Sequence, residues 1–135
     1  MALKSLLKKI AFDQNGLVPV VIQDAKTKAV LMVAYMNKKA LAKTLASGRT
    51  HFWSRSRNKL WSKGEQSGHI QKVRGIFYDC DADTLLIKVS QTGSACHAGY
   101  CSCFYRQINL NTLQSKVIGK KMFDPKQVYQ SKTRK

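Results

Sequence analysis

The chain has 135 residues, with 24 Lys and Arg against 7 Asp and Glu, so its formal net charge is +17. Hydrophobic residues make up 44% of it, which suits one globular domain over residues 1–135 and excludes disordered and collagen-like chains. No run approaches the roughly 18 apolar residues that span a bilayer, and the N-terminus lacks a signal-peptide pattern. We therefore expect a cytoplasmic protein that has no membrane partner.

The first half of the chain predicts a helix and then a hairpin. Residues 4–12 have the pattern of a short amphipathic helix, and Gly16 then breaks the pattern. Two apolar runs of β-forming residues follow, at 18–22 and 29–35, and a polar turn joins them. This arrangement is typical of a β-hairpin.

A second helix and a polar loop come next. Asn37 is the expected N-cap of a helix over 38–46 that ends near Gly48. Residues 50–53 have the composition of a strand, whereas 54–68 are polar and predict a long loop with a functional role.

The second half predicts further strands. They are expected at 73–78 and 84–89, on either side of an acidic segment, and at 103–108. With two short helices and several hairpin-like strands, the chain is expected to form an α+β fold with a mainly antiparallel sheet.

Three aspartates alternate in the acidic segment, although the chain has only seven acidic residues. On a strand, Asp79, Asp81 and Asp83 would project from one face and Cys80 from the other. Carboxylate oxygens suit Mg²⁺ or Ca²⁺, and a thiolate suits Zn²⁺. The alternative is a solvated acidic turn with Cys80 buried as a small apolar residue.

The four cysteines form a second cluster, because all of them fall between Cys80 and Cys103. In a reducing compartment, clustered cysteines are more often metal ligands or catalytic groups than disulfides. Three ligands from this set, with His97 beside Cys96, are easier to assemble than a closed four-cysteine site, and they leave the open position that a catalytic zinc needs for water. Buried cysteines without a metal remain the alternative.

The polar segment 51–69 is rich in residue types that bind phosphates and bases. Arginine offers bidentate donors, lysine a point charge, and tryptophan a stacking surface, while Glu65 and His69 are acid–base candidates. A basic solvated loop is the alternative. The candidate substrate-binding residues are Trp53, Ser54, Arg55, Arg57, Trp61, Lys63, Glu65 and Ser67.

The excess positive charge also raises the possibility of nucleic-acid binding. Residues 116–135 form a basic tail, but the remaining charge is spread thinly along the chain. RNP-type aromatic motifs, paired-histidine zinc fingers and basic-region heptads are all missing from the sequence. No specific nucleic acid is therefore expected. The positive electrostatic field of the protein could instead concentrate a phosphorylated metabolite near a cleft.

Five groups of motif residues occur together, at 52–57, 60–65, 67–71, 79–83 and 95–104. In this order and spacing, the chain resembles the phosphoribosyl-AMP cyclohydrolase family of histidine biosynthesis over about residues 16–107. The resemblance implies hydrolysis of the N1–C6 bond of the adenine ring in 1-(5-phosphoribosyl)-AMP by a zinc-activated water. The expected product is the ring-opened formimino carboxamide nucleotide.

The resemblance also implies the metal sites and the assembly. Zinc is expected on Cys80, Cys96 and Cys103, and magnesium on Asp79, Asp81 and Asp83. An intertwined homodimer is expected, in which each zinc site takes cysteines from both subunits. Cys101 departs from the family pattern and leaves open which thiols bind zinc. The residues after 107 are too few for the pyrophosphatase domain fused to many relatives, so the monofunctional form is expected.

Breaking the C6–N1 bond requires protonation of N1, and therefore a general acid. His97 is the first candidate for this proton transfer and His69 the second. Arg55, Arg57 and Lys63 are the cations expected at the two 5′-phosphates. The competing class is a small zinc-stabilised RNA-binding protein, which predicts a closed four-cysteine site and salt-dependent binding of polynucleotides.

Overall fold

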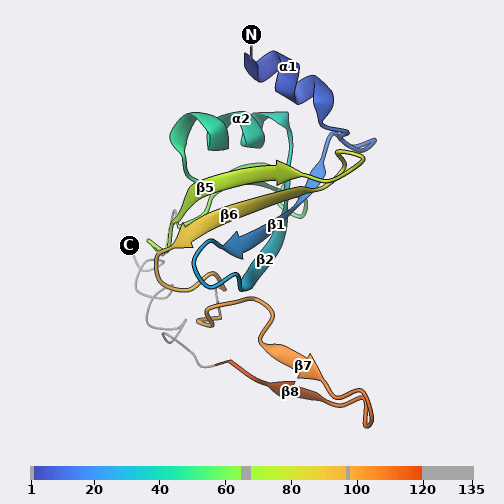
Figure 1. The fold of residues 1–135 in the computed structure, drawn as a ribbon, viewed down its shortest axis with the longest axis vertical. Helices are drawn as coiled ribbons and strands as arrows, with labels where there is room; N and C mark the ends of the chain where they lie inside the picture. The colour runs from blue at the N-terminus through green and yellow to red at the C-terminus, as the bar shows by residue number, and fades with distance from the viewer. Residues whose placement is uncertain (1, 65–67, 97, 120–135) are drawn as a thin grey trace.

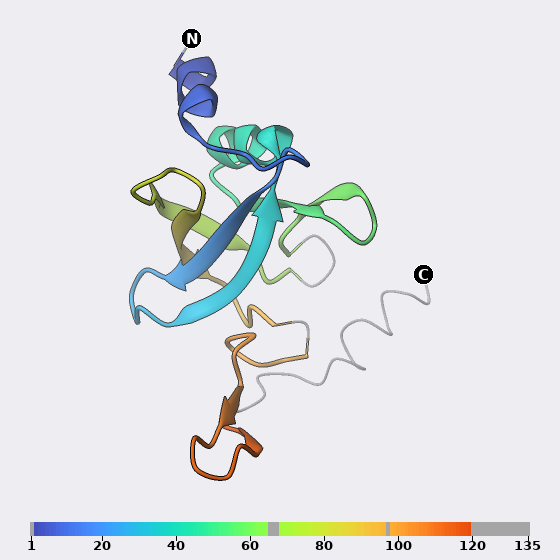
Figure 2. The ribbon, with the colours of Figure 1, turned by 90° about the vertical axis from the view of Figure 1, so that its right-hand side faces the viewer.

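The computed structural model describes residues 2–64, 68–96 and 98–119. Two helices lie at one end of a central sheet, and a small hairpin projects from the other end (Figures 1 and 2). Neither helix in this part of the chain is long and apolar enough to cross a membrane. In chain order the elements are α1 (Ala2–Lys9), β1 (Val18–Asp24), β2 (Val30–Met36), α2 (Lys38–Ser47), β3 (His51–Ser54), β4 (Lys59–Ser62), β5 (Gln71–Tyr78), β6 (Leu85–Gln91), β7 (Arg106–Ile108) and β8 (Ser115–Val117).

The central sheet has the strand order β2-β1-β6-β5. The pairs β1–β2 and β5–β6 are antiparallel, whereas the central pair β1–β6 is parallel. Two further antiparallel pairs, β3–β4 and β7–β8, lie outside this sheet. The prediction of an α+β fold with mostly antiparallel pairing is therefore confirmed, and the parallel central pair is an addition to it.

One face of the sheet forms the core. Alternate residues of β1 and β6 are buried, because successive side chains of a strand point to opposite faces. They pack with residues of α2 and β3, and each fully buried aliphatic side chain contributes about 1.5–3 kcal/mol. The central members of this core are Val18, Val20, Ile22, Leu41, Phe52, Leu85, Ile87 and Val89.

The helix α2 begins and ends at the predicted caps. The Asn37 side chain accepts a hydrogen bond of 2.8 Å from the Ala40 N–H, and Gly48 has the left-handed φ of 73°. The buried Thr44 hydroxyl oxygen accepts from the His51 N–H at 2.9 Å, which ties the helix to the start of β3. Capping thus sets the point at which the chain enters the segment that carries many candidate residues.

The prediction of one long loop over 54–68 is wrong, because this segment contains β4. Phe52 of β3 pairs with Trp61 of β4, and both Leu60 and Trp61 pack against the core. A turn with Asn58 at a φ of 52° closes the hairpin. Two apolar residues in an otherwise polar segment were sufficient for a strand because the core offered them a surface.

Smaller differences occur at the two ends of the chain. The helix predicted over 4–12 is shifted towards the N-terminus and ends at Lys9. The last predicted strand, over 103–108, is confined to Arg106–Ile108 and pairs with β8, which the pattern did not predict. The segment before it takes a turn-rich course that brings cysteines together.

Candidate metal and nucleotide site

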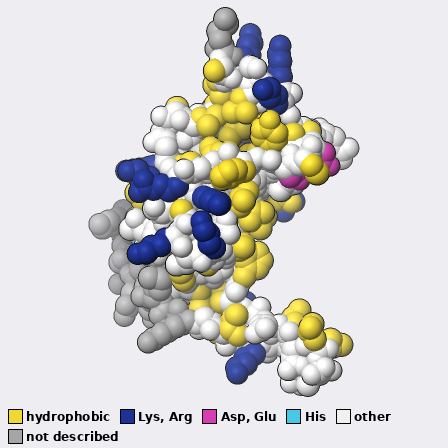
Figure 3. Space-filling model, viewed as in Figure 1, with side chains coloured by type: hydrophobic (Ala, Val, Ile, Leu, Met, Phe, Trp, Pro, Cys, Tyr) yellow, Lys and Arg dark blue, Asp and Glu magenta, His cyan; other side chains and the backbone are white. Residues whose placement is uncertain are grey.

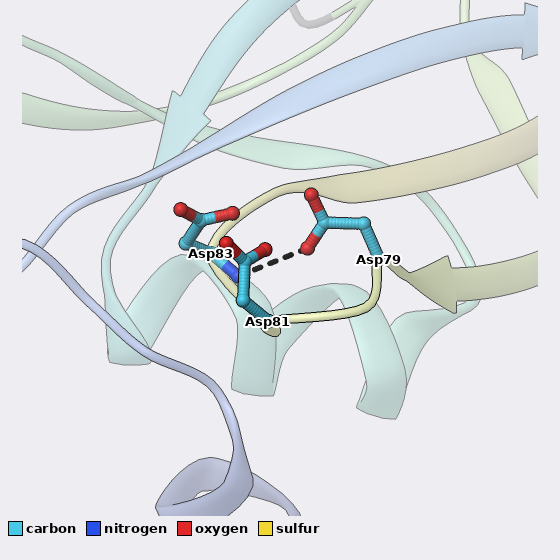
Figure 4. Close-up of side chains that lie close together, drawn as sticks. All are labelled: Asp79, Asp81 and Asp83. Atoms are coloured by element: carbon cyan, nitrogen blue, oxygen red, sulfur yellow. Dashed lines mark hydrogen bonds between the residues drawn. The ribbon is translucent and has the colours of Figure 1, made fainter.

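The three alternating aspartates lie in the turn between β5 and β6, and their carboxylates face one another (Figure 4). The expected strand geometry is wrong here, because Ala82 takes a left-handed φ of 59°. The Asp83 N–H donates to Asp79 Oδ1 at 3.1 Å, which closes the turn. One oxygen from each of the three carboxylates lies within 4.8 Å of the others. A tight turn therefore achieves the grouping that alternation on a strand was expected to provide.

The charges of this aspartate cluster fit a hard divalent cation. All three side chains are exposed, and acidic side chains gather at this edge of the molecule in Figure 3. A hydrogen bond with Asp81 raises the pKa of Asp83, and the nearby charges of Asp81 and Asp79 add to the effect. A cation among the carboxylates would relieve this repulsion, and oxygen ligands are those that Mg²⁺ prefers.

Cys80 belongs to the same turn and is exposed. Its Sγ lies 4.0 Å from Asp81 Oδ1, so the thiol is beside the carboxylates rather than on an opposite face. The alternative of a buried apolar Cys80 is also wrong. A thiol in this position is available to a ligand or to another protein surface.

The other end of β6 leads into a loop that brings Cys96 and Cys103 together. The loop folds back on itself, because the Ala95 N–H donates to the Cys101 carbonyl at 3.1 Å. The Cys103 N–H donates to the carbonyl of Leu31 at 2.7 Å and so attaches the loop to β2. Desolvation raises the pKa of Cys103 to about 11, and the charge and hydrogen bond of Cys96 add to this. The Cys103 thiol and the Cys96 thiol beside it are soft ligands, and a soft metal bound to them would replace their protons.

Within the described residues, Cys80 does not join this thiol pair. It precedes β6, whereas Cys96 and Cys103 follow it, and seven residues of strand span roughly 20 Å. The only group of three potential metal ligands that meets in the described part of one chain is the aspartate cluster. The three predicted zinc ligands are therefore divided between the two ends of β6.

Lys63 follows β4 directly and is only 8% exposed. Desolvation lowers the pKa of its ammonium group, and the nearby Cys103 and Cys96 oppose that effect. The next residue, Gly64, has a φ of +87°, and a Cβ there would lie 2.7 Å from the Ile70 nitrogen. Lys63 is thus a buried cation beside the thiol pair, and a glycine makes the close turn possible.

His69 lies close to the same cysteine loop. Its Nδ1 is 3.4 Å from the Ser94 N–H and 3.3 Å from the Ser94 hydroxyl, which in turn donates to the Cys96 carbonyl at 3.1 Å. Because an N–H can only donate, Nδ1 accepts, and the proton of the neutral ring is on Nε2. Ser94 is a site residue that the sequence analysis missed, and its place two residues before Cys96 was the available signal.

Two candidate phosphate-binding arginines lie in the turn between β3 and β4. Arg55 and Arg57 are exposed, and the Arg55 guanidinium lies 4.0 Å from the centre of the Tyr35 ring. The Ser54 hydroxyl accepts from the Arg57 N–H at 3.2 Å and therefore shapes the turn.

The two tryptophans of the β3–β4 hairpin are half-buried. Trp61 packs on Phe52 with a ring-centre distance of 4.9 Å, so part of its surface is used in the core. Trp53 lies next to Phe52 in β3. Glu65, Ser67 and His97 lie outside the described residues.

Comparison with known proteins identifies the family. The family model for phosphoribosyl-AMP cyclohydrolase matches residues 32–105. A phosphoribosyl-AMP cyclohydrolase from Pelotomaculum thermopropionicum is 55% identical over 91% of this chain and 95% of its own length. One from Methanococcoides burtonii is 53% identical over 91% of this chain and 98% of its own length. A bifunctional histidine biosynthesis protein from Thermoanaerobacter pseudethanolicus is 53% identical over 98% of this chain and 61% of its own length. The chain therefore belongs to the phosphoribosyl-AMP cyclohydrolase family, whose members are hydrolases.

Proposed function

We propose that this protein hydrolyses the N1–C6 bond of the adenine ring in 1-(5-phosphoribosyl)-AMP, to give the formimino carboxamide nucleotide in L-histidine biosynthesis. The observation that carries the proposal is the meeting of Cys96, Cys103, Lys63 and His69 in a chain that matches cyclohydrolases almost end to end. The four cysteines are unbonded, which agrees with a reducing cytoplasm. The comparisons give no support to the alternative of an RNA-binding protein.

Zinc is the metal that suits the thiol pair. Cys96 and Cys103 would hold it, with Cys80 as the third ligand, and an open position would remain for water. When bound, zinc lowers the pKa of a coordinated water towards neutrality. Lys63 would offset part of the negative charge of the thiolates, since its ammonium group is buried beside them.

The third ligand is proposed to come from a second subunit. The roughly 20 Å length of β6 separates Cys80 from Cys96 within one chain and so supports a shared site. In a homodimer, the β5–β6 turn of each subunit would reach the cysteine loop of its partner. The same arrangement would bring the aspartate cluster close to the zinc site.

The outer face of the sheet offers a surface for this dimer. Val33, Val21, Leu86 and Phe77 are register partners in turn across all four strands, on the face opposite the core. Val33 and Phe77 are both 49% exposed. Hydrophobic side chains also gather along the sheet on the face that Figure 3 views. An exposed apolar row of this kind is a candidate interface, and a second copy of the chain would cover it.

The remaining steps are assigned to side chains. His69 in its imidazolium form is proposed to give its Nε2 proton to N1 as the C6–N1 bond breaks, which leaves a neutral ring; while charged, its Nδ1–H would donate to the Ser94 hydroxyl. His97 is the other candidate for this proton transfer. Arg55 and Arg57 would bind the 5′-phosphates, assisted by Mg²⁺ on Asp79, Asp81 and Asp83.

The direct test is an absorbance assay of phosphoribosyl-AMP ring opening with the purified protein, together with its zinc content. We expect turnover and about one zinc per chain. Cys103→Ser should lose both, whereas Asn111→Ala, an exposed residue between β7 and β8, is a control for surface substitution. A zinc-loaded, folded protein that binds the nucleotide without opening its ring would contradict the proposed reaction.

A further inference from the structure

A buried chain of side-chain hydrogen bonds runs from Thr50 through Gln71 to Gln91. Thr50 and Gln71 are fully buried, and their side chains are joined by a 2.8 Å bond from the Thr50 hydroxyl to Gln71 Oε1. Gln71 Nε2 donates to Gln91 Oε1, also at 2.8 Å. Gln91 Nε2 faces backbone carbonyls, at 2.8 Å from Thr92 and 3.1 Å from His69. Burying polar side chains costs free energy, so this series of hydrogen bonds requires an explanation beyond packing.

We call the hydrogen-bonded series Thr50, Gln71 and Gln91 the relay. The backbone carbonyls that contact Gln91 determine the donor and the acceptor of every bond in it. Backbone carbonyls can only accept, so Gln91 must present its amide nitrogen to them and its oxygen to Gln71. Gln71 must then present its own nitrogen to Gln91 and its oxygen to Thr50. The orientation of both amides is therefore unique, and a carboxylate at either position would place an oxygen against an acceptor.

The relay joins the three segments that carry the candidate site. Thr50 lies before β3, and its carbonyl accepts from the Lys63 N–H at 3.2 Å. Gln91 ends β6, and its amide nitrogen lies 3.4 Å from the Ser94 carbonyl in the cysteine loop. The carbonyl of His69, on the segment before β5, accepts from the same nitrogen. The backbone at Lys63, at His69 and in the loop of Cys96 is thus hydrogen-bonded to one buried set of residues, Thr50, Gln71 and Gln91.

We propose that Gln71 and Gln91 are positioning residues, which set the place of His69 and of the Cys96 loop relative to Lys63. This inference rests on the proposed function, because its consequence is measured on ring opening. Each glutamine would act through the backbone carbonyls and side chains that its amide holds, rather than on the substrate itself. Small displacements of reacting groups lower the rate of a chemical step far more than they weaken substrate binding.

The test compares kcat and KM for phosphoribosyl-AMP in Gln91→Glu and Gln71→Glu, which keep the side-chain shape but replace the amide NH₂ and its two N–H donors by a carboxylate oxygen. We expect kcat to fall about 10- to 100-fold, with KM within about threefold of the wild-type value. Thr50→Val, which removes the hydroxyl, should lower kcat in the same way. Thr50→Ser, which retains it, should restore most of the wild-type kcat.

Thr44→Val is the control for lost stability. It removes a buried hydroxyl whose bonds are to helix and strand backbone, at the carbonyls of Ala40 and His51 and at the His51 N–H. We expect Thr44→Val to lower the melting temperature by as much as Thr50→Val but to leave kcat unchanged. Folded glutamate variants with wild-type kcat, or an equal loss of kcat in Thr44→Val, would overturn the proposal. An inactive wild-type protein would instead overturn the proposed function.

Discussion

The imidazole of His69 occupies the space that a side chain at position 93 would need. A Cβ added to Gly93 would lie 2.6 Å from Cδ2 of the His69 ring, a separation that real Cβ atoms essentially never show. Gly93 also has a φ of +69°, which disfavours any other residue. The glycine two residues beyond β6 therefore allows the histidine to lie against the cysteine loop.

This relationship predicts the effect of Gly93→Ala. The methyl group must displace His69, so we expect kcat for ring opening to fall at least tenfold and the protein to lose about 1–2 kcal/mol of unfolding free energy. Gly16→Ala is the matched control, because Gly16 has a φ of +75° and nothing within 4 Å of its added Cβ. That variant should lose stability but keep its activity. Equal activity in the two variants would show that the position of His69 is not important.

The thiol pair predicts which cysteines hold zinc. Cys96→Ser and Cys103→Ser should each lose zinc and nearly all turnover, because each removes one of two adjacent thiolates. Cys101→Ser should retain about one zinc per chain and most activity, since the described contact of Cys101 in the loop is through its backbone carbonyl, whereas the thiols of Cys96 and Cys103 are hydrogen-bonded to each other. Metal content measured by mass spectrometry decides the matter. Loss of zinc from Cys101→Ser would indicate a closed four-cysteine site.

The aspartate cluster predicts a separate magnesium requirement. Asp81→Asn should raise the magnesium concentration needed for half-maximal activity about tenfold or more and leave zinc content unchanged, because it removes one hard ligand. The same change should lower the pKa of Asp83 towards its ordinary value, since Asp81 is the main cause of its increase. Carboxyl NMR titration measures that shift. An Asp81→Asn protein without zinc would contradict two independent metal sites.

The distance between Cys80 and the thiol pair predicts complementation between inactive chains. Cys80→Ser and Cys103→Ser homodimers should both be inactive. If each zinc site draws on both subunits, a mixed dimer has one intact site and should recover up to half of the wild-type activity per dimer. The measurement is activity after unfolding and refolding the two variants together, with differently tagged chains to quantify mixed dimers. Mixed dimers without activity would exclude the shared site but not the reaction.

The buried ammonium of Lys63 predicts opposite effects on stability and on metal binding. Desolvation lowers its pKa, so the charged form is costly in the metal-free protein. Lys63→Met should therefore stabilise the metal-free protein by about 1 kcal/mol, as replacements of buried charges by apolar groups often do. The same variant should release zinc faster to a chelator, because the thiolates lose a counter-charge. Unchanged zinc release would show that Lys63 does not balance their charge.

Local patterns in the sequence were sufficient for several elements. The first hairpin was predicted because its two apolar runs and polar turn lie next to each other in the chain. Both caps of α2 were predicted because Asn37 and Gly48 act on backbone within four residues of themselves. The aspartate and cysteine clusters were identified as candidate metal ligands from their residue types, whereas the proposed zinc set of Cys80, Cys96 and Cys103 came from the resemblance to the family. Turns and helix caps depend on interactions between residues that are close in the chain, so local sequence is sufficient to predict them.

Tertiary structure decided what depends on distant contacts. Strand β4 formed because the core offered Leu60 and Trp61 a surface, and the aspartates converged because a left-handed Ala82 made a turn where alternation suggested a strand. Lys63, expected at a phosphate, is buried beside Cys103, forty positions along the chain. The relay through Gln71 and Gln91 likewise joins segments about twenty positions apart. Burial and hydrogen-bond direction arise only when these segments meet in the fold, so composition and periodicity could not predict them.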